Sequence, residues 1–313
     1  MRIHIKLATL FFIGLSCASK ALAGEVPISE WGPEDTLGAV NRLTPQNIIR
    51  ASKLVTKGKA YPLGVITGSE SPAVDPRTYQ MTILQLDDGS GIPAGNNKLT
   101  GNDDLMNTFM GIGSQIDGLG HVGIDHYYYN NTHSKDFVKV TGLTKFSTHE
   151  IPPIVTRGVL LDIAGLKEVK MLQAGQVISR LDIEQAMARQ KVTIQEGDVV
   201  LFHTGWMNLS ESDGVKFMAG EPGIGVEGAV YLAQKKVVAV GSDTYGLEAV
   251  PFEEKGTFYP VHQELLAKRG IYILENMDTR EMASDQVWEF MFVLGQPRFE
   301  GSVQAVINPI AIR

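Results

Sequence analysis

The residues best suited to chemistry lie in one glycine-rich segment, residues 106–129, where five glycines surround Gln115, Asp117 and His121. Glycine has no Cβ, so its backbone lets polar side chains crowd about one point. Asp117 and His121 are four residues apart, a spacing that places both side chains on one face of a helical turn. A carboxylate beside an imidazole can bind a divalent metal ion or transfer a proton. The same spacing also fits an ordinary structural hydrogen bond.

A second candidate pair is His262 and Glu275. Residues 260–268 are expected to form a helix that carries His262, and residues 271–275 a strand that ends at Glu275. A charged group at the end of a buried strand lies at the carboxyl edge of the sheet, where the active sites of α/β proteins form. The alternative is a surface histidine on a helix and an ordinary glutamate at a strand end.

Three further candidate residues, Trp206, Tyr127 and Asp243, lie after expected strands or at the end of the glycine-rich segment. Residues 203–206 come directly after an expected strand and either present Trp206 to a substrate or form a turn around a core tryptophan. Three consecutive tyrosines begin at Tyr127, and at most two of them can face one side. Asp243 follows another expected strand and is either a catalytic carboxylate or a cap for the next turn.

Several common catalytic motifs are absent from the sequence. There is no G-x-S-x-G, P-loop or H-E-x-x-H sequence. Residues 118–123 fit the dinucleotide pattern G-x-G-x-x-G, but the buried strand before it and the helix after it are missing. The single cysteine, Cys17, leaves no basis for an internal disulfide or a cysteine-rich zinc site.

The composition is that of a globular, acidic protein. Hydrophobic residues make up 43% of the 313 residues, which is too many for a disordered chain. The net charge of −7 and the lack of a Lys/Arg run disfavour a nucleic-acid partner.

The first 23 residues have the three-part pattern of a secretory signal peptide. Arg2 and Lys6 precede the apolar run 7–15, and an A-x-A site closes the segment at Ala23. A membrane anchor or a buried N-terminal helix are the alternatives, but the apolar run is too short to span a bilayer. Cleavage after Ala23 would remove three basic residues and no acidic one, leaving 290 residues with net charge −10. The segment therefore predicts a periplasmic or secreted protein without membrane contact after cleavage.

Residues 24–313 are predicted to form a single domain, because no linker, repeat or charge block interrupts them. After residue 158, apolar runs alternate with helical patterns, which predicts an α/β core whose sheet is buried on both faces. Asp182, with Gln185 three residues later, is the expected N-cap of a helix over 183–190. Strands are expected at 79–86, 158–163, 198–202, 237–241 and 271–275, helices also at 45–57, 226–235 and 260–268, and a loop at 89–101.

Taken in order, these segments resemble the cyclase family of metal-dependent hydrolases, which includes bacterial kynurenine formamidases and isatin hydrolases. Residues 113–121, GSQIDGLGH, are similar to the family's metal motif H-x-G-T-H-x-D-x-P-x-H, and residues 204–206 to its T-G-W. Further similar segments are WGPEDTLGAVN at 31–41, PG at 222–223, VGSD at 240–243, His262, Glu275 and the ending PIAI at 309–312. The resemblance covers the chain after the signal peptide and implies a swivelling β/β/α domain that is commonly oligomeric.

The resemblance also implies hydrolysis of an amide, lactam or ester bond by water that a divalent metal ion activates. It implies a set of metal ligands, Gln115, Asp117, His121 and Glu275. It implies catalytic groups that carry protons or orient one another, His121, His262 and Glu275. Trp206 and Tyr127 are then the candidate substrate contacts, which points to a small aromatic or flat molecule.

Two family histidines are replaced in this chain. The first falls on Gly111 and the second on Gln115, and the proline of the motif falls on Leu119. A glutamine oxygen is a neutral donor that suits a hard cation, so the site is expected to prefer Mn²⁺ or Mg²⁺ over Zn²⁺. A replacement ligand could come from one of three residues, Asn107, His126 or His133.

These replacements leave two other functions open. One is an exported protein that binds a small molecule on a hydrolase scaffold without turnover. The other is a lyase or dehydratase that uses Asp117 and His121 for proton transfer. In every case the expected partners are a small-molecule ligand and other copies of the chain.

Overall fold

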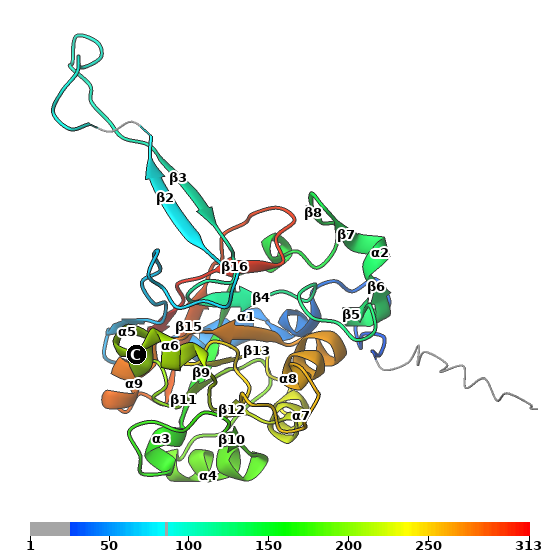
Figure 1. Ribbon diagram of the computed structural model, residues 1–313. Coiled ribbons are helices and arrows are strands. Elements are labelled where there is room, and N and C mark those ends of the chain that lie inside the picture. Colours follow the sequence, from blue (N-terminus) through cyan, green and yellow to red (C-terminus); the bar gives the residue numbers. More distant parts are fainter. Residues whose placement is uncertain (1–25, 85–86) are drawn as a thin grey trace, which may run out of the picture.

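The computed structural model describes residues 26–84 and 87–313, so the signal peptide expected at 1–23 lies outside the described residues. Most of the described chain forms one α/β unit from which a long hairpin projects (Figure 1). Within the described ranges, no helix has the length and apolar character needed to cross a bilayer.

The largest sheet in the described chain has nine strands, in the order β1-β17-β15-β9-β11-β13-β14-β4-β16. Its central strands are parallel and almost wholly buried: β9 (Ile154–Asp162), β11 (Val199–His203), β13 (Ala239–Ser242) and β14 (Tyr272–Glu275). Continuous apolar runs are typical of parallel strands that are covered on both faces. The α/β fold predicted from the sequence is confirmed.

Antiparallel strands extend both sides of this parallel centre. Beyond β9 lie β15 (Glu289–Leu294), β17 (Ile310–Ile312) and β1 (Ala60–Pro62). Beyond β14 lie β4 (Gln115–Asp117) and β16 (Gln304–Val306). The segment that resembles the family's metal motif therefore joins the sheet beside the strand that ends at Glu275.

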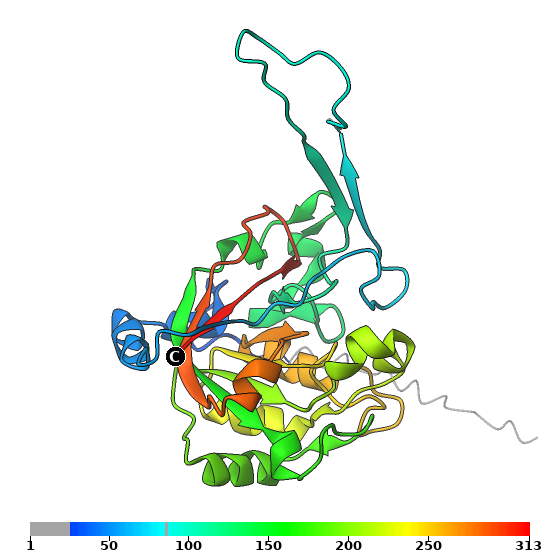
Figure 2. The same ribbon diagram turned by 90° about the vertical axis from the view of Figure 1, so that its left-hand side faces the viewer.

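Helices connect the parallel strands. α4 (Arg180–Gln190) lies between β9 and β11, and α7 (Val226–Gln234) lies between β11 and β13. α8 (Pro260–His262) and the π-helix η4 (Gln263–Lys268) lie between β13 and β14. Figure 1 and Figure 2 show α4 and α7 below the sheet, and the two helices contact each other. α1 (Pro45–Ser52) packs against β9 and β15 and ends five residues earlier than expected.

The N-cap of α4 is Ser179 rather than Asp182, which corrects the sequence prediction. Asp182 is the third residue of a reciprocal capping box. Its carboxylate accepts a hydrogen bond from Ser179 N at 2.9 Å, and Ser179 Oγ accepts one from Asp182 N at 3.2 Å. The pairs 179/182 and 182/185 have the same spacing, so the pattern alone did not distinguish the two registers.

A second correction concerns residues 115–121, which do not form a helical turn. Residues 115–117 are strand β4, and His121 lies in the following turn, where its backbone N donates to Gly118 O at 3.0 Å. β4 is paired on both edges, with β14 and with β16. Tertiary strand pairing has therefore overridden the helical spacing of Asp117 and His121.

The hairpin that projects from the body consists of β2 (Tyr79–Ile83) and β3 (Asp104–Thr108), and we call residues 79–108 the arm. Figure 1 and Figure 2 show that it extends away from the sheet. Its strands pair with Met81 opposite Met106, and these side chains are 43% and 47% exposed. A two-stranded hairpin with no packed face is marginally stable in water.

The remaining elements are short and mostly connect the main ones. They are η1 (Gly38–Arg42), β5 (Tyr127–Tyr128), η2 (Tyr129–Asn131), β6 (Thr132–His133), α2 (Ser134–Phe137), β7 (Val138–Lys139), β8 (Gly142–Leu143), η3 (Thr148–Glu150), α3 (Ile163–Leu166), β10 (Val177–Ile178), α5 (Asn208–Ser212), α6 (Gly214–Met218), β12 (Gly223–Ile224) and α9 (Arg280–Ser284).

Candidate metal centre

Two adjacent antiparallel strands, β4 and β14, form the floor of the candidate site. Their register places Gln115 opposite Glu275 and Asp117 opposite Ile273. Gln115 and Asp117 share one face of β4 because side chains alternate along a strand. On the other edge of β4, β16 places Gln304 opposite Asp117. Strand pairing thus brings polar residues that are distant in sequence into one buried region.

Asp117, His262 and Glu275 form a group of metal-ligating side chain types in the described chain that could hold a metal ion. Their potential ligand atoms all lie within 4.8 Å of one another, and all three side chains are buried. His262 Nε2 lies 3.2 Å from Glu275 Oε1 and 3.5 Å from Asp117 Oδ2. Two carboxylates and one imidazole around a single point are a donor set that divalent metal ions bind.

Two glutamine amides complete the polar lining. Gln115 Nε2 donates to Glu275 Oε2 and lies 3.4 Å from Asp117 Oδ1. Gln304 Nε2 donates to Asp117 Oδ1 at 2.7 Å. Gln115 was expected at the centre from its place in the motif. Gln304 was not, because only the pairing of β16 with β4 brings it there.

Glu248 holds His262 in a single orientation. Its Oε1 accepts hydrogen bonds from His262 Nδ1 at 2.7 Å and from His262 N at 3.0 Å, and its Oε2 accepts one from Val261 N at 3.1 Å. Both backbone donors lie in the first turn of α8, where N–H groups have no partner within the helix. Nδ1 is thereby fixed as a donor, so Nε2 faces Asp117 and Glu275. Sequence analysis missed Glu248, since it precedes His262 by 14 residues without any periodic signal.

Burial and neighbouring charges shift the pKa of each group in the centre. Burial alone would lower the pKa of His262, but hydrogen bonds to Asp117, Glu248 and Glu275 raise it well above its usual value. Burial raises the pKa of Glu275 to about 7, and the negative charge of Asp117 adds to this effect. Burial would also raise the pKa of Asp117, but the charge of His121 and the hydrogen bond from His262 lower it. These shifts favour a protonated His262 and an ionised Asp117 as long as no metal ion is bound, so a metal ion that binds Nε2 of His262 would displace a proton.

Two buried oxygen atoms of this cluster are under-satisfied among the described residues: Gln115 Oε1 has no hydrogen-bond partner, and Asp117 Oδ2 has only the long contact with His262 Nε2 at 3.5 Å. An unpaired buried acceptor costs about 1–3 kcal/mol, so such atoms are typical of groups that bind a cation or a ligand. Hard cations such as Mn²⁺ and Mg²⁺ bind carboxylate and amide oxygens. The donor set of Asp117, Glu275 and His262 therefore fits a divalent metal ion. The amide of Gln115 presents its nitrogen to the two carboxylates, so its role as a ligand stays a prediction.

His121 lies beside this group rather than within it. Its ring centroid is 6.3 Å from that of His262, and the side chain is partly exposed in the turn after β4. Burial lowers the pKa of His121, and the positive charges of His262 and Arg77 lower it further against the opposing charge of Asp117. A neutral imidazole in this position can accept a proton. His121 therefore lies where a proton carrier could act on the centre. Its role as a metal ligand stays a prediction.

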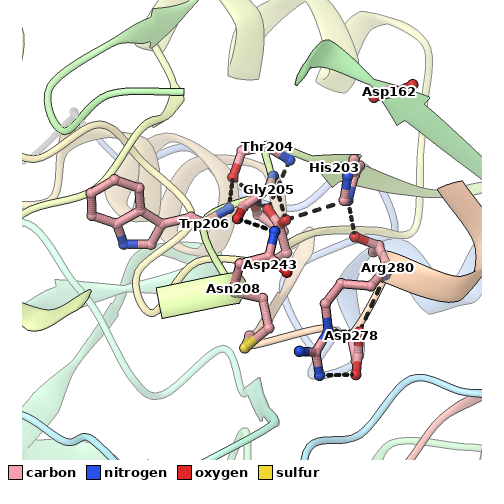
Figure 3. Close-up of polar contacts among 12 residues, drawn as sticks. Asp162, His203, Thr204, Gly205, Trp206, Asn208, Asp243, Asp278 and Arg280 are labelled. Atoms are coloured by element: carbon pink, nitrogen blue, oxygen red, sulfur yellow. Dashed lines mark hydrogen bonds and ion pairs between the residues drawn. The ribbon is translucent and has the colours of Figure 1, made fainter. Parts of the chain in front are cut away.

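The T-G-W segment is fixed in place by Asp243 (Figure 3). Asp243 Oδ1 accepts hydrogen bonds from Thr204 N at 2.9 Å and Thr204 Oγ1 at 2.6 Å, and Oδ2 accepts one from Gly205 N at 2.8 Å. Trp206 is 2% exposed, and its indole N–H donates to Phe217 O at 3.1 Å. This arrangement corresponds to a turn around a core tryptophan, and contact of Trp206 with a substrate stays a prediction.

His203 lies next to this turn and does not complete a catalytic triad. Its Nδ1 lies 2.7 Å from Thr279 Oγ1 and 3.4 Å from Asp243 Oδ2, as Figure 3 shows in part. A triad needs the carboxylate on one ring nitrogen and the hydroxyl on the other, but here both face the same nitrogen. Thr279 is also wholly buried. The group stabilises the loops after β11 and β13.

The remaining predicted residues lie in other parts of the structure. Tyr127 packs edge-on against His133 with ring centroids 5.1 Å apart, and His126 stacks on His133 at 6.1 Å. Asn107 is exposed on the arm. In the described part of the chain, neither His126 nor His133 joins the metal-type cluster, whereas His262 does. Asn107 as a ligand stays a prediction. Tyr127 as a substrate contact stays a prediction.

The fold and the buried centre together define an α/β protein with a site of the divalent-metal type at the end of a parallel strand. The chain belongs to the cyclase family, since the family model described as "Putative cyclase" matches residues 52–249. The resemblance inferred from the sequence is confirmed.

Solved structures of the same fold include metal-dependent hydrolases. A structure described as a "novel cyclase" is 28% identical, with a TM-score of 0.82, and the match covers 90% of this chain and 96% of that one. Isatin hydrolase A from Ralstonia solanacearum is 18% identical, with a TM-score of 0.63 and coverage of 86% and 97%. A "predicted metal-dependent hydrolase" from Bacillus stearothermophilus is 18% identical, with a TM-score of 0.54 and coverage of 81% and 97%. No curated protein matches the chain. Family membership and the buried cluster support a hydrolase-like function with a divalent metal ion.

Proposed function

We propose that the protein is a metal-dependent hydrolase that cleaves an amide, lactam or ester bond of a small substrate with water. One observation carries the proposal: the potential ligand atoms of Asp117, His262 and Glu275 lie within 4.8 Å of one another in the buried part of the described chain. Membership of the cyclase family supports it.

Each residue has a defined part in this chemistry. Asp117 and Glu275 offer carboxylate oxygens, Gln115 offers a neutral amide oxygen, and His262 offers Nε2 because Glu248 holds Nδ1 as a donor. A bound divalent ion would lower the pKa of a water molecule and polarise a carbonyl group. Oxygen donors outnumber nitrogen donors, which favours Mn²⁺ or Mg²⁺ over Zn²⁺.

His121 is the proposed proton carrier. It borders the centre, with its ring edge-on to that of His262 and its side chain partly exposed. A neutral ring nitrogen can take a proton from the attacking water and pass it to the leaving group. The partial exposure of His121 gives that proton a route to solvent.

Metal analysis and turnover assays test the proposal on the purified protein and on Asp117→Ala. We expect bound metal and hydrolysis of at least one arylformamide, isatin-like lactam or lactone in the wild type, and loss of both in the variant. Asp136→Ala, which removes an exposed carboxylate on α2, is the matched control and should retain both.

Incorporation of ¹⁸O from labelled water into the product acid distinguishes hydrolysis from a lyase reaction. No turnover and no metal, with tight ligand binding, would support the binding-protein alternative instead.

We also propose that the protein is exported and forms a homo-oligomer. The signal-like pattern of residues 1–23 supports export. The arm supports oligomerisation, because its apolar residues Met81, Ile83, Leu105 and Met106 are 43–54% exposed in a single chain.

A further inference from the structure

Arg77 places a guanidinium group at the position of the first replaced family histidine. Its Nη1 donates to Gly111 O at 2.6 Å. A Cβ added at Gly111 would lie 2.6 Å from this Nη1 and 2.8 Å from Cζ, closer than Cβ atoms approach other atoms in proteins. The guanidinium fits here because residue 111 has no side chain.

This guanidinium borders the polar lining of the metal-type centre. The same Cβ position would lie 2.9 Å from Gln304 Oε1, and Gln304 Nε2 binds Asp117 Oδ1 at 2.7 Å. Burial is the largest influence on the pKa of both His121 and Glu275, and the positive charge of Arg77 lowers both. The charge of Arg77 therefore acts on both the proton carrier and the carboxylate cluster.

Arg77 has no carboxylate of its own. Among the described residues, its only side-chain hydrogen bond is the one to Gly111 O, and the side chain is partly exposed. Arg157 is different, since it is buried and binds both Asp198 and Glu289. A guanidinium with free N–H groups can bind a carboxylate through two parallel hydrogen bonds. An arginine of this kind at the edge of a reaction centre is suited to hold an anionic part of a substrate.

We propose that Arg77 recognises a carboxylate group on the substrate and that Gly111 provides the space for it. The inference rests on the proposed function, because the scissile bond must reach Asp117, His262 and Glu275 while the carboxylate binds Arg77. The substrate class is then a small organic acid that carries an amide, lactam or ester bond a few atoms from its carboxylate. A position that holds a metal ligand in the family motif becomes a substrate-binding position in this chain.

A matched pair of substrates tests the inference: 2-formamidobenzoate and formanilide, which differ only in the carboxylate. We expect Arg77→Gln to lower kcat/KM for the acid about 10- to 100-fold, mainly through KM, since a charge-assisted bond to a carboxylate is lost. The same variant should change kcat/KM for formanilide by less than about twofold. Gly111→Ala should reproduce the loss although the arginine remains, because its methyl group displaces the guanidinium. Arg180→Gln, on the exposed face of α4, should alter neither substrate.

Binding of 2-aminobenzoate, measured by titration calorimetry, gives a second readout that does not need turnover. We expect the wild type to bind 2-aminobenzoate. We expect Arg77→Gln to bind it about 10- to 100-fold more weakly, which matches the expected loss in kcat/KM for the acid. Thermal unfolding of both variants identifies any effect that comes from loss of the fold.

The outcomes separate this inference from the proposed function. If Arg77→Gln affects the acid and formanilide equally, or if 2-aminobenzoate binds the wild type no better than the variant, carboxylate recognition by Arg77 is wrong. Hydrolysis by the wild type would still support the proposed function in that case. If 2-aminobenzoate binding depends on Arg77 but no amide, lactam or ester is hydrolysed, the carboxylate site stands and the proposed hydrolysis fails.

Discussion

Replacing Glu248 with glutamine tests whether the orientation of His262 matters for metal binding, because the variant keeps every proposed metal ligand. The carboxylate of Glu248 accepts three hydrogen bonds, from Val261 N, His262 N and His262 Nδ1. An amide of the same shape has one oxygen and one –NH2 group. Whichever way the amide turns, its nitrogen faces at least one N–H donor, so at least one buried donor loses its acceptor.

The size of the effect follows from these contacts. A buried donor without an acceptor costs about 1–3 kcal/mol, and removing the negative charge beside His262 adds to that cost. We therefore expect the free energy of unfolding to fall by about 2–4 kcal/mol in Glu248→Gln. We expect the affinity for Mn²⁺ to fall by about 10- to 100-fold, because a histidine ligand loses the partner that fixes its tautomer and direction.

Two measurements test this reasoning. Titration calorimetry with MnCl2 gives the metal affinity, and urea denaturation of the metal-free protein gives the stability. Glu254→Gln, which changes an exposed glutamate in the loop before α8, is the control and should match the wild type in both. Unchanged Mn²⁺ affinity in a folded Glu248→Gln variant would refute the orienting role of Glu248.

Three further predictions concern stability and assembly. Asp35 accepts five hydrogen bonds, one of them from Tyr129 Oη at 2.6 Å, and these outweigh burial so that its pKa lies below the usual 3.8. Asp35→Asn should therefore lower the free energy of unfolding by about 1–3 kcal/mol at pH 7, and urea denaturation should show this deficit shrinking as the pH falls below 3.8. Arg157→Ala leaves buried Asp198 with only the more distant Arg50 at 3.7 Å and should cost about 3–5 kcal/mol, measured as a lower Tm. Met81→Lys on the arm should reduce the mass of the proposed homo-oligomer in light scattering, because a charge replaces an exposed apolar contact.

A control variant or a contrary result tests each of these three predictions. A deficit in Asp35→Asn that stays constant down to pH 2 would contradict the lowered pKa. Arg180→Ala removes an exposed arginine and should leave Tm within about 1 °C of the wild type, since isolated surface ion pairs contribute little. Equal masses for wild type and Met81→Lys would show that this face of the arm does not join subunits.

The parallel centre of the sheet was predictable from the sequence because its strands are unbroken apolar runs. The expected strands at 198–202, 237–241 and 271–275 coincide with β11, β13 and β14 to within two residues. Such strands can be recognised from composition alone, since a strand that is buried on both faces consists of consecutive apolar residues. The four-residue spacing of Asp117 and His121 gave the wrong local structure, because partners on β14 and β16 determine the conformation of β4.

The candidate site was predictable only where residues resemble a motif. Asp117, His262 and Glu275 were identified in this way, and the structure brings them together. Glu248, Gln304 and the guanidinium of Arg77 carry no motif of their own. Glu248 reaches the centre because it binds the first turn of α8, and Gln304 because β16 pairs with β4. The guanidinium of Arg77 reaches it because Gly111 has no Cβ. These are properties of the folded chain.

The arm has a mechanical consequence for the centre. Arg77 lies two residues before β2, and Gly111 lies three residues after β3, so both ends of the arm run directly into the carboxylate-recognition position. Figure 1 shows the base of the arm beside β16, the strand that carries Gln304. Because both ends of the arm run into this position, a contact that shifts the base of the arm would move the guanidinium relative to Asp117. If subunits of the proposed homo-oligomer contact the arm, they would act as allosteric effectors, and the proposed preference for acids would depend on the protein concentration.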